Sequence, residues 1–408
     1  MPPRILFLTP SWPLGQQYGM QLRALQIGRA LKSVGAVNVV VIDSDAESES
    51  GWRATEAEFR VLPPVHCRHT PNRTPSQKLR WAFDTRYMNV HGSTATESDR
   101  RRVAEYCAES DLVWVLNARV PNLLHRWTWP AAHLDLNDLP STYIRSLKRI
   151  APSVREGIKA RIVEALLRRR ERSFSQRFTT LSVCSEQDRA YLGGGEAIHV
   201  IPNGFAAPIG EPTRNLAPEP RIGFIGLGSY EPNVDGVGWF LRECWPGVRR
   251  LVPGVRLRVA GRETDPDRFN RPEGVDFLGE IADSATEMAT WWAMVVPIRL
   301  GAGTRVKIAE AFSRKCPVIS TALGAFGYDV QDRQHLRLAD TAPAFVDACV
   351  DVLRDPASAA GLAERAFADY LRRWTWEAIA PRVWAAADAC LRASNPSVHS
   401  RRGTVGQC

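Results

Sequence analysis

The chain has 408 residues, of which 44% are hydrophobic and 24% charged, so it is too long for one ordinary domain and long enough for two cores. Its eight cysteines include no CxxC pair and no Cys/His cluster, which argues against a zinc site or a disulfide framework and indicates a reducing cytosol. The formal net charge is +9, and no stretch reaches the ~18 uncharged apolar residues that a membrane span requires. The first apolar run, RILFLTP, is broken by prolines too early for a signal peptide, so we expect a cytoplasmic protein.

Short apolar, β-branched runs alternate with helical patterns through the first half of the chain. A helix is predicted at 19–35, where apolar residues recur on one face and Gly35 closes the pattern. Strands are predicted at 4–10, 37–43, 111–118, 133–139, 180–185 and 197–204. This alternation predicts a parallel sheet with helices on both faces.

A basic segment lies within this half. Residues 142–177 contain eleven Lys and Arg against three Glu, and 161–177 reads as an amphipathic basic helix. The charged face of such a helix is either simply exposed to solvent or contacts an anionic surface, such as membrane lipid or a phosphorylated acceptor. No recognised nucleic-acid module accompanies the charge, which argues against nucleic acid as a partner.

A proline-rich break divides the chain. Residues 206–220 contain four prolines and little apolar periodicity, and we interpret them as a linker after a first domain, 1–205. In the second domain, 221–375, strands are predicted at 221–227, 255–261, 274–279, 294–298 and 316–321, and helices at 233–251 and 307–315. A helix follows at 376–394, and 395–408 is predicted to be a disordered tail. The fold class is therefore α/β, with two Rossmann-like domains facing across a cleft, and in such sheets ligands bind beyond the carboxyl ends of the strands.

A glycine-rich loop follows the predicted strand 294–298. It contains Arg299, Gly301, Ala302, Gly303 and Thr304, and the glycines allow the backbone to approach a ligand closely. A helix is expected to begin near Thr304, and its first-turn N–H groups favour an anion.

Two cations and a carboxylate follow this loop. Arg305 and Lys307 oppose the helix dipole unless an anion lies nearby, which favours a bound phosphate. Glu310, farther into the helix, could accept hydrogen bonds from a ribose diol. Together these features are typical of a site for a nucleoside diphosphate. The same residues also fit a simpler interpretation, in which Glu310 lies on the helix surface and the glycines only form a turn. The pattern is neither a Walker P-loop nor the dinucleotide fingerprint.

The segment LDLNDLPS, residues 134–141, places polar side chains near a strand end. Asn137 and Asp138 could contact a sugar or an acceptor, or they could simply cap the strand. No second carboxylate cluster supports a metal site. His133 is interpreted as a structural residue.

The second domain resembles the carboxyl-terminal half of the GT-B glycosyltransferases, and most closely the retaining nucleotide-sugar enzymes of glycosyltransferase family 4. The resemblance is carried by GFIGLGSYEPN, GVDFLGEIAD and VVPIRLGAGTRVKIAEAFSRKCPVIST, over roughly 220–345. It is looser in the first domain, in FLTPSWPLGQQYGMQ, LDLNDLPS, VCSEQDRAYL and VIPNGF. The last helix resembles the family's helix that crosses back to the first domain.

The resemblance implies roles for these residues. Glu310 would bind the donor ribose, the loop Gly301–Thr304 would meet the diphosphate or sugar, and Arg305 and Lys307 would neutralise the leaving diphosphate. Gly15 and Gly19 would lie in a loop that faces the diphosphate from the first, acceptor-side domain. Relatives usually require no metal, so no cofactor is expected beyond the nucleoside-diphosphate sugar itself.

Two departures from the family pattern stand out. Many relatives carry two glutamates, E-x7-E, and here Ala302 occupies the first position. Many also carry Arg or Lys after the first strand of this domain, where this chain has Gly228, Ser229 and Tyr230. Arg305 and Lys307 would then carry more of the phosphate charge, and Gly228 and Ser229 are still predicted to contact the donor.

The sequence therefore predicts a glycosyltransferase of the hexosyltransferase type, which moves a sugar from a nucleoside diphosphate to an acceptor hydroxyl with retention. Arg305, Lys307 and Asp138 are the predicted catalytic residues. Two alternatives remain, a GT-B-fold sugar-nucleotide epimerase or hydrolase, and a non-enzymatic basic binding protein. The base, the sugar and the acceptor stay open, the acceptor being lipid-linked, phosphorylated or a small molecule, and the basic segment leaves room for peripheral contact with the inner membrane surface.

Overall fold

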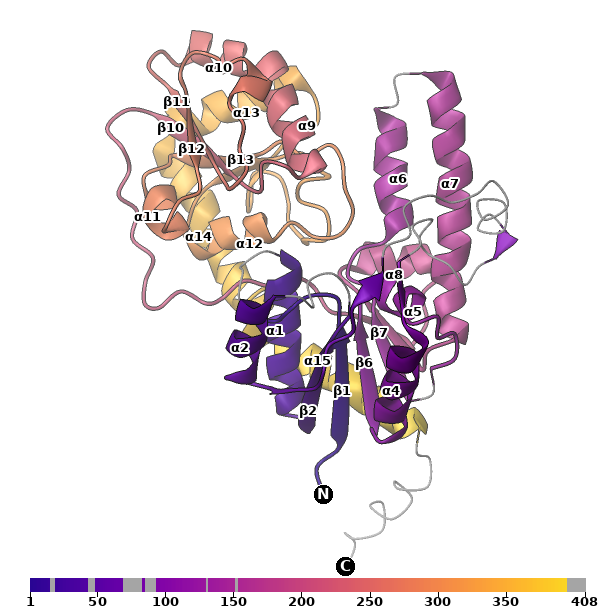
Figure 1. The fold of residues 1–408 in the computed structure, drawn as a ribbon. Helices are drawn as coiled ribbons and strands as arrows, with labels where there is room; N and C mark the ends of the chain where they lie inside the picture. The colour runs from indigo at the N-terminus through magenta and orange to yellow at the C-terminus, as the bar shows by residue number, and fades with distance from the viewer. Residues whose placement is uncertain are drawn as a thin grey trace, which may run out of the picture. The chain divides into compact units, whose positions relative to one another are not determined.

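The computed structural model describes residues 1–14, 19–42, 48–68, 83–84, 93–129, 131–150 and 153–394 (Figure 1). The chain forms two compact units. Unit 1 contains Met1–Ser141, Val154–Pro202 and Ile379–Cys408, and unit 2 contains Thr142–Ser153 and Asn203–Ala378. The predicted tail, 395–408, lies outside the described residues.

Unit 1 is built on a seven-stranded parallel sheet. Its strands, in spatial order, are β3 (Arg60–Val61), β2 (Ala36–Val41), β1 (Arg4–Thr9), β6 (Leu112–Leu116), β7 (Ala132–Asp135), β8 (Thr180–Val183) and β9 (Ile198–Val200). All five residues of β6 are buried, as expected for a strand covered on both faces. The six strands predicted in this half are all present. A separate antiparallel pair joins β4 (Cys67–Arg68) and β5 (Thr94–Ala95).

The helices of unit 1 have recognisable start and stop signals. They are α1 (Gly19–Lys32), α2 (Glu49–Glu56), α4 (Glu97–Ala108), α5 (Arg119–Leu123), α7 (Val154–Ser173), the 3₁₀ turn η2 (Phe174–Gln176), α8 (Glu186–Leu192) and most of α15 (Trp376–Ser394). At α8, the Ser185 hydroxyl accepts from the Asp188 N–H, and Gly193 ends the helix in the left-handed conformation. In α15, Trp384 Nε1 donates to Ala30 O at 2.9 Å, which attaches this helix to α1.

A fully buried ion pair stabilises the carboxyl end of β7. Arg23 from α1 donates to both carboxylate oxygens of Asp135, at 2.8 and 3.0 Å, and also to Ile201 O at 3.0 Å. Neighbouring His133 lies between Thr180 and Ser182, and burial lowers its pKa well below the ordinary value. Asp135 and His133 therefore serve the core of unit 1, as expected for His133 from the sequence.

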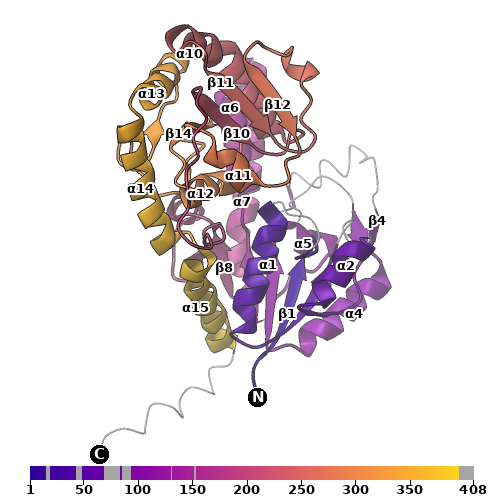
Figure 2. The same cartoon turned by 90° about the vertical axis from the view of Figure 1, so that its left-hand side faces the viewer.

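Unit 2 has a six-stranded parallel sheet. The spatial order is β12 (Val275–Gly279), β11 (Arg256–Ala260), β10 (Arg221–Ile225), β13 (Ala293–Val296), β14 (Val318–Ser320) and β15 (Arg337–Leu338). Its helices are α6 (Pro140–Arg149, in this unit from Thr142), α9 (Glu231–Trp239), α10 (Trp245–Leu251), the 3₁₀ turn η4 (Asp267–Phe269), α11 (Ser284–Ala289), α12 (Val306–Ser313), α13 (Ala342–Arg354) and α14 (Pro356–Arg373). Figure 2 shows α14 running alongside α12, and α10 packs against α13. The five predicted strands are confirmed.

The predicted helix 233–251 is present, but it contains a π-helical segment, η3 (Phe240–Cys244), between α9 and α10. Pro246 has no N–H to continue the ladder of α-helical hydrogen bonds, which accounts for the shifted pairing before it. The helical segments α9, η3 and α10 therefore follow β10 without a break in the chain.

The proline-rich segment 206–220 is bound to the edge of unit 2. Arg214 donates to Met288 O at 3.0 Å, Asn215 N to Ala289 O at 3.0 Å, and Trp292 Nε1 to Ala217 O at 2.9 Å. Main-chain and side-chain hydrogen bonds therefore attach this segment to unit 2. Within the described ranges, no helix has the length and apolar character needed to cross a membrane.

Candidate functional site

The order of strands in unit 2 places the predicted glycine-rich loop at a reversal point. From β10 the chain proceeds to β11 and β12 on one side, and from β13 to β14 and β15 on the other. All pairs are parallel, so the loops after β10 and β13 leave the same edge of the sheet side by side. Ligands of doubly wound sheets bind at this kind of edge.

Glycine is required in the loop after β13. Gly301 and Gly303 have φ values of 126° and 68°, in the region that favours glycine. A Cβ atom on Gly301 would also lie 2.5 Å from Arg305 Nη2. Leu300, Ala302 and Thr304 are buried in this loop, so its path is fixed by packing as well as by its glycines.

Arg305 holds the loop in this shape. Its guanidinium turns back on the loop and donates to Gly303 O at 2.8 Å and to Ala302 O. Arg305 is only 8% exposed, and the Tyr328 hydroxyl donates to Arg305 O at 3.0 Å. We expected a cation presented at the start of the helix, and the structure instead uses Arg305 to bind the loop carbonyls.

The helix begins slightly later than predicted. α12 starts at Val306 rather than near Thr304, and Arg305 is its extended N-cap residue. The Thr304 hydroxyl is buried and has no hydrogen-bond partner among the described residues. Two positive-φ glycines keep the residues before Val306 out of the helical conformation, which accounts for the later start.

Lys307 connects α12 to α9, the helices that follow the two loops. Its ammonium donates to Asn233 Oδ1 at 2.9 Å and lies 3.9 Å from the centre of the Phe224 ring. A Cβ atom on Gly226 would come within 2.8 Å of this Nζ. Burial lowers the pKa of Lys307 to about 7, the positive charge of Arg305 acts in the same direction, and Glu310 opposes it. The amine of Lys307 therefore has a neutral amide as its hydrogen-bond partner. A bound anion would stabilise its charged form, which burial disfavours.

Glu310 lies one turn beyond Lys307 on α12. The Ser284 hydroxyl of α11 donates to its Oε1 at 2.6 Å, and within the described part of the chain no donor reaches Oε2. Burial raises the pKa of Glu310, while the Ser284 hydrogen bond and the charges of Arg314 and Lys307 oppose this effect. One carboxylate oxygen is fixed, and the other is left for a further donor.

The loop after β10 is packed tightly at two predicted residues. Gly228 N donates to Arg262 O at 2.8 Å, and a Cβ atom on Gly228 would lie 2.4 Å from Glu263 O. The Ser229 hydroxyl donates to the Glu263 carboxylate. Both residues therefore attach this loop to the residues that follow β11.

Arg299, predicted to bind the donor, is engaged with α9. Its guanidinium makes two hydrogen bonds to the Asp235 carboxylate, at 2.7 and 3.2 Å, and lies 5.3 Å from the Trp239 ring centre. This forked ion pair clamps the start of the loop to the helix after β10.

Two residues of α6 that the sequence did not indicate contact the loop after β13 and the start of α9. The Ser146 hydroxyl accepts from the Gly301 N–H at 2.9 Å, and the Tyr143 hydroxyl donates to the Glu231 carboxylate at 2.6 Å. These residues lie more than 80 positions from their partners in the sequence, so no local sequence pattern could predict the two hydrogen bonds.

The remaining predicted residues belong to unit 1. Gly15 lies outside the described residues, and Gly19 is the first residue of α1. Asp138 follows β7 and is half-buried. Its neighbour Asn137 has a φ of 58° and accepts a hydrogen bond from Cys184. The structure therefore brings the predicted loop, Lys307 and Glu310 together within unit 2, and it leaves Asp138 and Gly19 in unit 1.

Replacing Gly301 by alanine is expected to destabilise the chain by about 1–3 kcal/mol, because alanine must adopt an unfavourable φ beside the buried Arg305. Urea unfolding measures the change. Gly157, inside α7 with open space around it, is the matched control, and its replacement by alanine should stabilise by about 0.5–1 kcal/mol. Equal effects of the two substitutions would contradict the strained geometry assigned to the loop.

The segment that contains this site matches a known family model. Residues 219–355 match the family model described as Glycosyl transferases group 1. Both loops, Lys307 and Glu310 lie inside the matched segment. No curated protein gives a significant sequence match.

Solved structures resemble the whole chain. Sucrose-phosphate synthase from Thermosynechococcus elongatus is 18% identical, with a TM-score of 0.69 over 96% of this chain and 100% of that one. HepE from Anabaena, solved with UDP, is 16% identical, with a TM-score of 0.61 over 95% and 100%. WaaG, a glycosyltransferase involved in lipopolysaccharide biosynthesis, is 14% identical, with a TM-score of 0.56 over 94% and 98%. At these identities the likeness establishes the fold, and the predicted GT-B class with two Rossmann-like domains is confirmed.

Proposed function

We propose that this chain is a glycosyltransferase that transfers a hexose from a nucleoside diphosphate to an acceptor hydroxyl, with retention of configuration. The observation that carries the proposal is the pair Lys307 and Glu310 on α12, directly after the glycine-rich loop at the sheet's reversal point. The family match over 219–355 supports the same reaction class.

The diphosphate of the donor would bind at the amine of Lys307. Among the described residues, the hydrogen-bond acceptor of this half-buried ammonium is the neutral amide oxygen of Asn233, so a phosphate would supply the missing negative charge. The ribose would bind at Glu310, where Oε2 is open to a diol while Ser284 orients the carboxylate through Oε1. The spacing of three residues puts both groups on one face of α12.

Chemistry would then depend on stabilising the leaving group. As the bond between the anomeric carbon and the β-phosphate oxygen breaks, negative charge grows on the diphosphate, and Lys307 would neutralise it. Arg305 would act by holding the loop carbonyls, so that the main chain from Gly301 to Thr304 faces the phosphates or the sugar. The acceptor hydroxyl would lose its proton to the departing phosphate. We propose that Asp138 contributes from the acceptor side, and that no metal is required.

A UDP-sugar is the first donor to test. HepE was solved with UDP and with UDP-glucose, and this chain shares its fold. The acceptor that we favour is lipid-linked or phosphorylated, since the basic segment 142–177 would suit an anionic surface.

A panel of nucleoside diphosphates and their sugars in a thermal-shift assay tests the donor site. A ligand at 100 times its Kd should stabilise the fold by about 2.7 kcal/mol. Stabilisation by one nucleoside diphosphate family, followed by sugar transfer to an added acceptor, supports the proposal. Release of free sugar or an epimer without transfer would favour a hydrolase or epimerase, and a flat panel would favour a non-enzymatic basic protein.

A further inference from the structure

Helix α7 carries a stripe of exposed aliphatic side chains. Val154, Ile158 and Ile162 are 82%, 53% and 57% exposed, and their spacing of four residues places them on one face of the helix. Arg155 and Lys159 are exposed beside them. Scattered single apolar residues are normal on a protein surface, but three in register on one helix form a continuous apolar strip.

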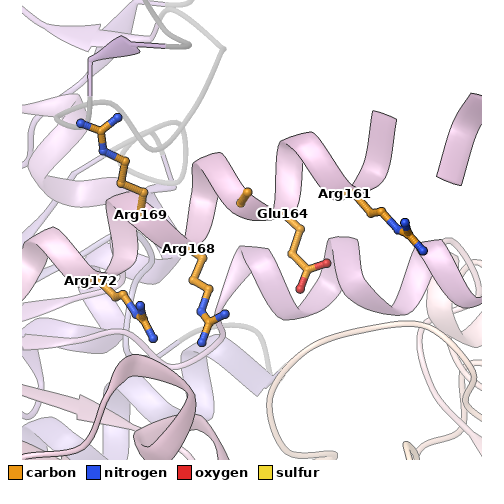
Figure 3. A pocket seen from close by; sticks show the side chains of 6 residues that line it. Arg161, Glu164, Arg168, Arg169 and Arg172 are labelled. Atoms are coloured by element: carbon orange, nitrogen blue, oxygen red, sulfur yellow. The ribbon is translucent and has the colours of Figure 1, made fainter. Parts of the chain in front are cut away.

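A basic groove continues the same helix toward its carboxyl end. A hollow of about 450 Å³ is lined by Arg161, Glu164, Ala165, Arg168, Arg169 and Arg172 (Figure 3). Figure 3 shows Glu164, Arg168 and Arg172 pointing to one side of α7 and Arg169 to the other. Arg168 also lies 4.4 Å from the Tyr191 ring centre, which fixes its position. Four arginines against one glutamate make this half of the helix strongly cationic.

The opposite side of α7 is already used by the core of unit 1. Leu167, Arg170 and Glu171 are buried, and the Glu171 carboxylate accepts from Ser141 N at 2.8 Å. The helix is therefore held in place by one face. The aliphatic stripe lies on the outward face, with Arg169 on one side of the helix and Arg168 and Arg172 on the other.

We propose that this face of α7 docks on an anionic lipid bilayer, with Val154, Ile158 and Ile162 at the acyl boundary and the arginines against lipid phosphates. A soluble polyanion would satisfy the arginines but would offer nothing to bury the aliphatic stripe. An anionic bilayer offers both an apolar layer and a sheet of phosphates, and a helix lying in its interface uses both. The proposal does not rest on the glycosyltransferase activity, because α7 belongs to unit 1 and the donor residues to unit 2.

Flotation of the full chain with lipid vesicles tests this docking. Binding to vesicles that contain phosphatidylglycerol should exceed binding to pure phosphatidylcholine at least tenfold and should fall with added salt. The double variant Ile158→Glu/Ile162→Glu should lose at least tenfold in vesicle affinity, and Arg161→Glu/Arg169→Glu should lose a similar factor.

Matched controls separate this surface from general charge and hydrophobicity. Leu251→Glu/Leu371→Glu changes two exposed aliphatics elsewhere, and Arg60→Glu/Arg250→Glu changes two exposed arginines outside α7. Both should bind as the wild type does, with all variants verified as folded by their thermal unfolding. Equal losses in the control variants, equal binding to neutral vesicles, or tight RNA binding without vesicle binding would overturn the proposal.

Discussion

Replacing Glu310 by alanine is expected to weaken nucleotide binding by roughly 10²–10⁴-fold. A hydrogen bond to a charged group contributes about 1.5–3 kcal/mol, and a ribose diol would make two of them with this carboxylate. Each 1.4 kcal/mol corresponds to a factor of about ten in Kd. Calorimetry of wild type and variant with the nucleoside diphosphate identified in the thermal-shift panel measures the loss.

Two further variants isolate the role of this carboxylate. Glu280→Gln changes an exposed carboxylate with 73% side-chain exposure and should leave the nucleotide Kd unchanged. Ser284→Ala removes the hydrogen bond to Oε1 but leaves the carboxylate, and it should have a smaller effect than Glu310→Ala. If the Kd of Glu310→Ala equals that of wild type in a folded protein, the ribose contact assigned to Glu310 is wrong.

Lys307→Met is expected to lower kcat by about 10²–10³-fold, the loss typical when a group that stabilises transition-state charge is removed. Methionine keeps most of the side-chain volume over the Phe224 ring but carries no charge. Steady-state transfer assays at saturating donor measure kcat. Lys315→Met serves as the matched control, because Lys315 forms its ion pairs with Glu211 and Glu364, and its kcat should stay near that of wild type. Equal losses of kcat in the two variants would contradict the proposal that Lys307 stabilises the leaving diphosphate.

The same lysine predicts a pH dependence of donor binding. Burial lowers the pKa of Lys307 to about 7 without ligand, and a bound diphosphate would raise it. Below pH 7 the amine is already charged and affinity should be flat, whereas above pH 7 binding takes up a proton and affinity should fall by up to about tenfold per pH unit. Lys307→Arg stays charged and should flatten this profile between pH 7 and 9. A wild-type profile that is flat or rising over this range would contradict the buried amine as the phosphate partner.

Much of the fold could be predicted from local patterns. The buried runs at β1, β6, β10 and β13 are apolar and β-branched, so alternation alone indicated parallel strands joined by helices. The paired glycines at 301 and 303 likewise announced a loop with positive φ. These signals are local, and the backbone conformation they specify depends little on the rest of the chain.

The positions of the charged side chains could not be predicted in the same way. Arg299 and Arg305 look alike in sequence, as cations beside a glycine-rich loop. The structure pairs Arg299 with Asp235, 64 residues away, and turns Arg305 back on carbonyl groups that only this loop geometry brings together. Lys307 donates instead to the neutral side-chain amide of Asn233 on the helix that follows β10. Ser146 was missed for the same reason, since its partner Gly301 lies 155 residues away.

A crystal structure of the full chain with UDP, or with whichever nucleoside diphosphate the panel identifies, tests the central claim most directly. The account predicts diphosphate oxygens within hydrogen-bond distance of Lys307 Nζ and of the main chain between Gly301 and Thr304, and both ribose hydroxyls at the Glu310 carboxylate. A nucleotide that binds elsewhere in unit 2, or that turns its ribose away from Glu310, would contradict it.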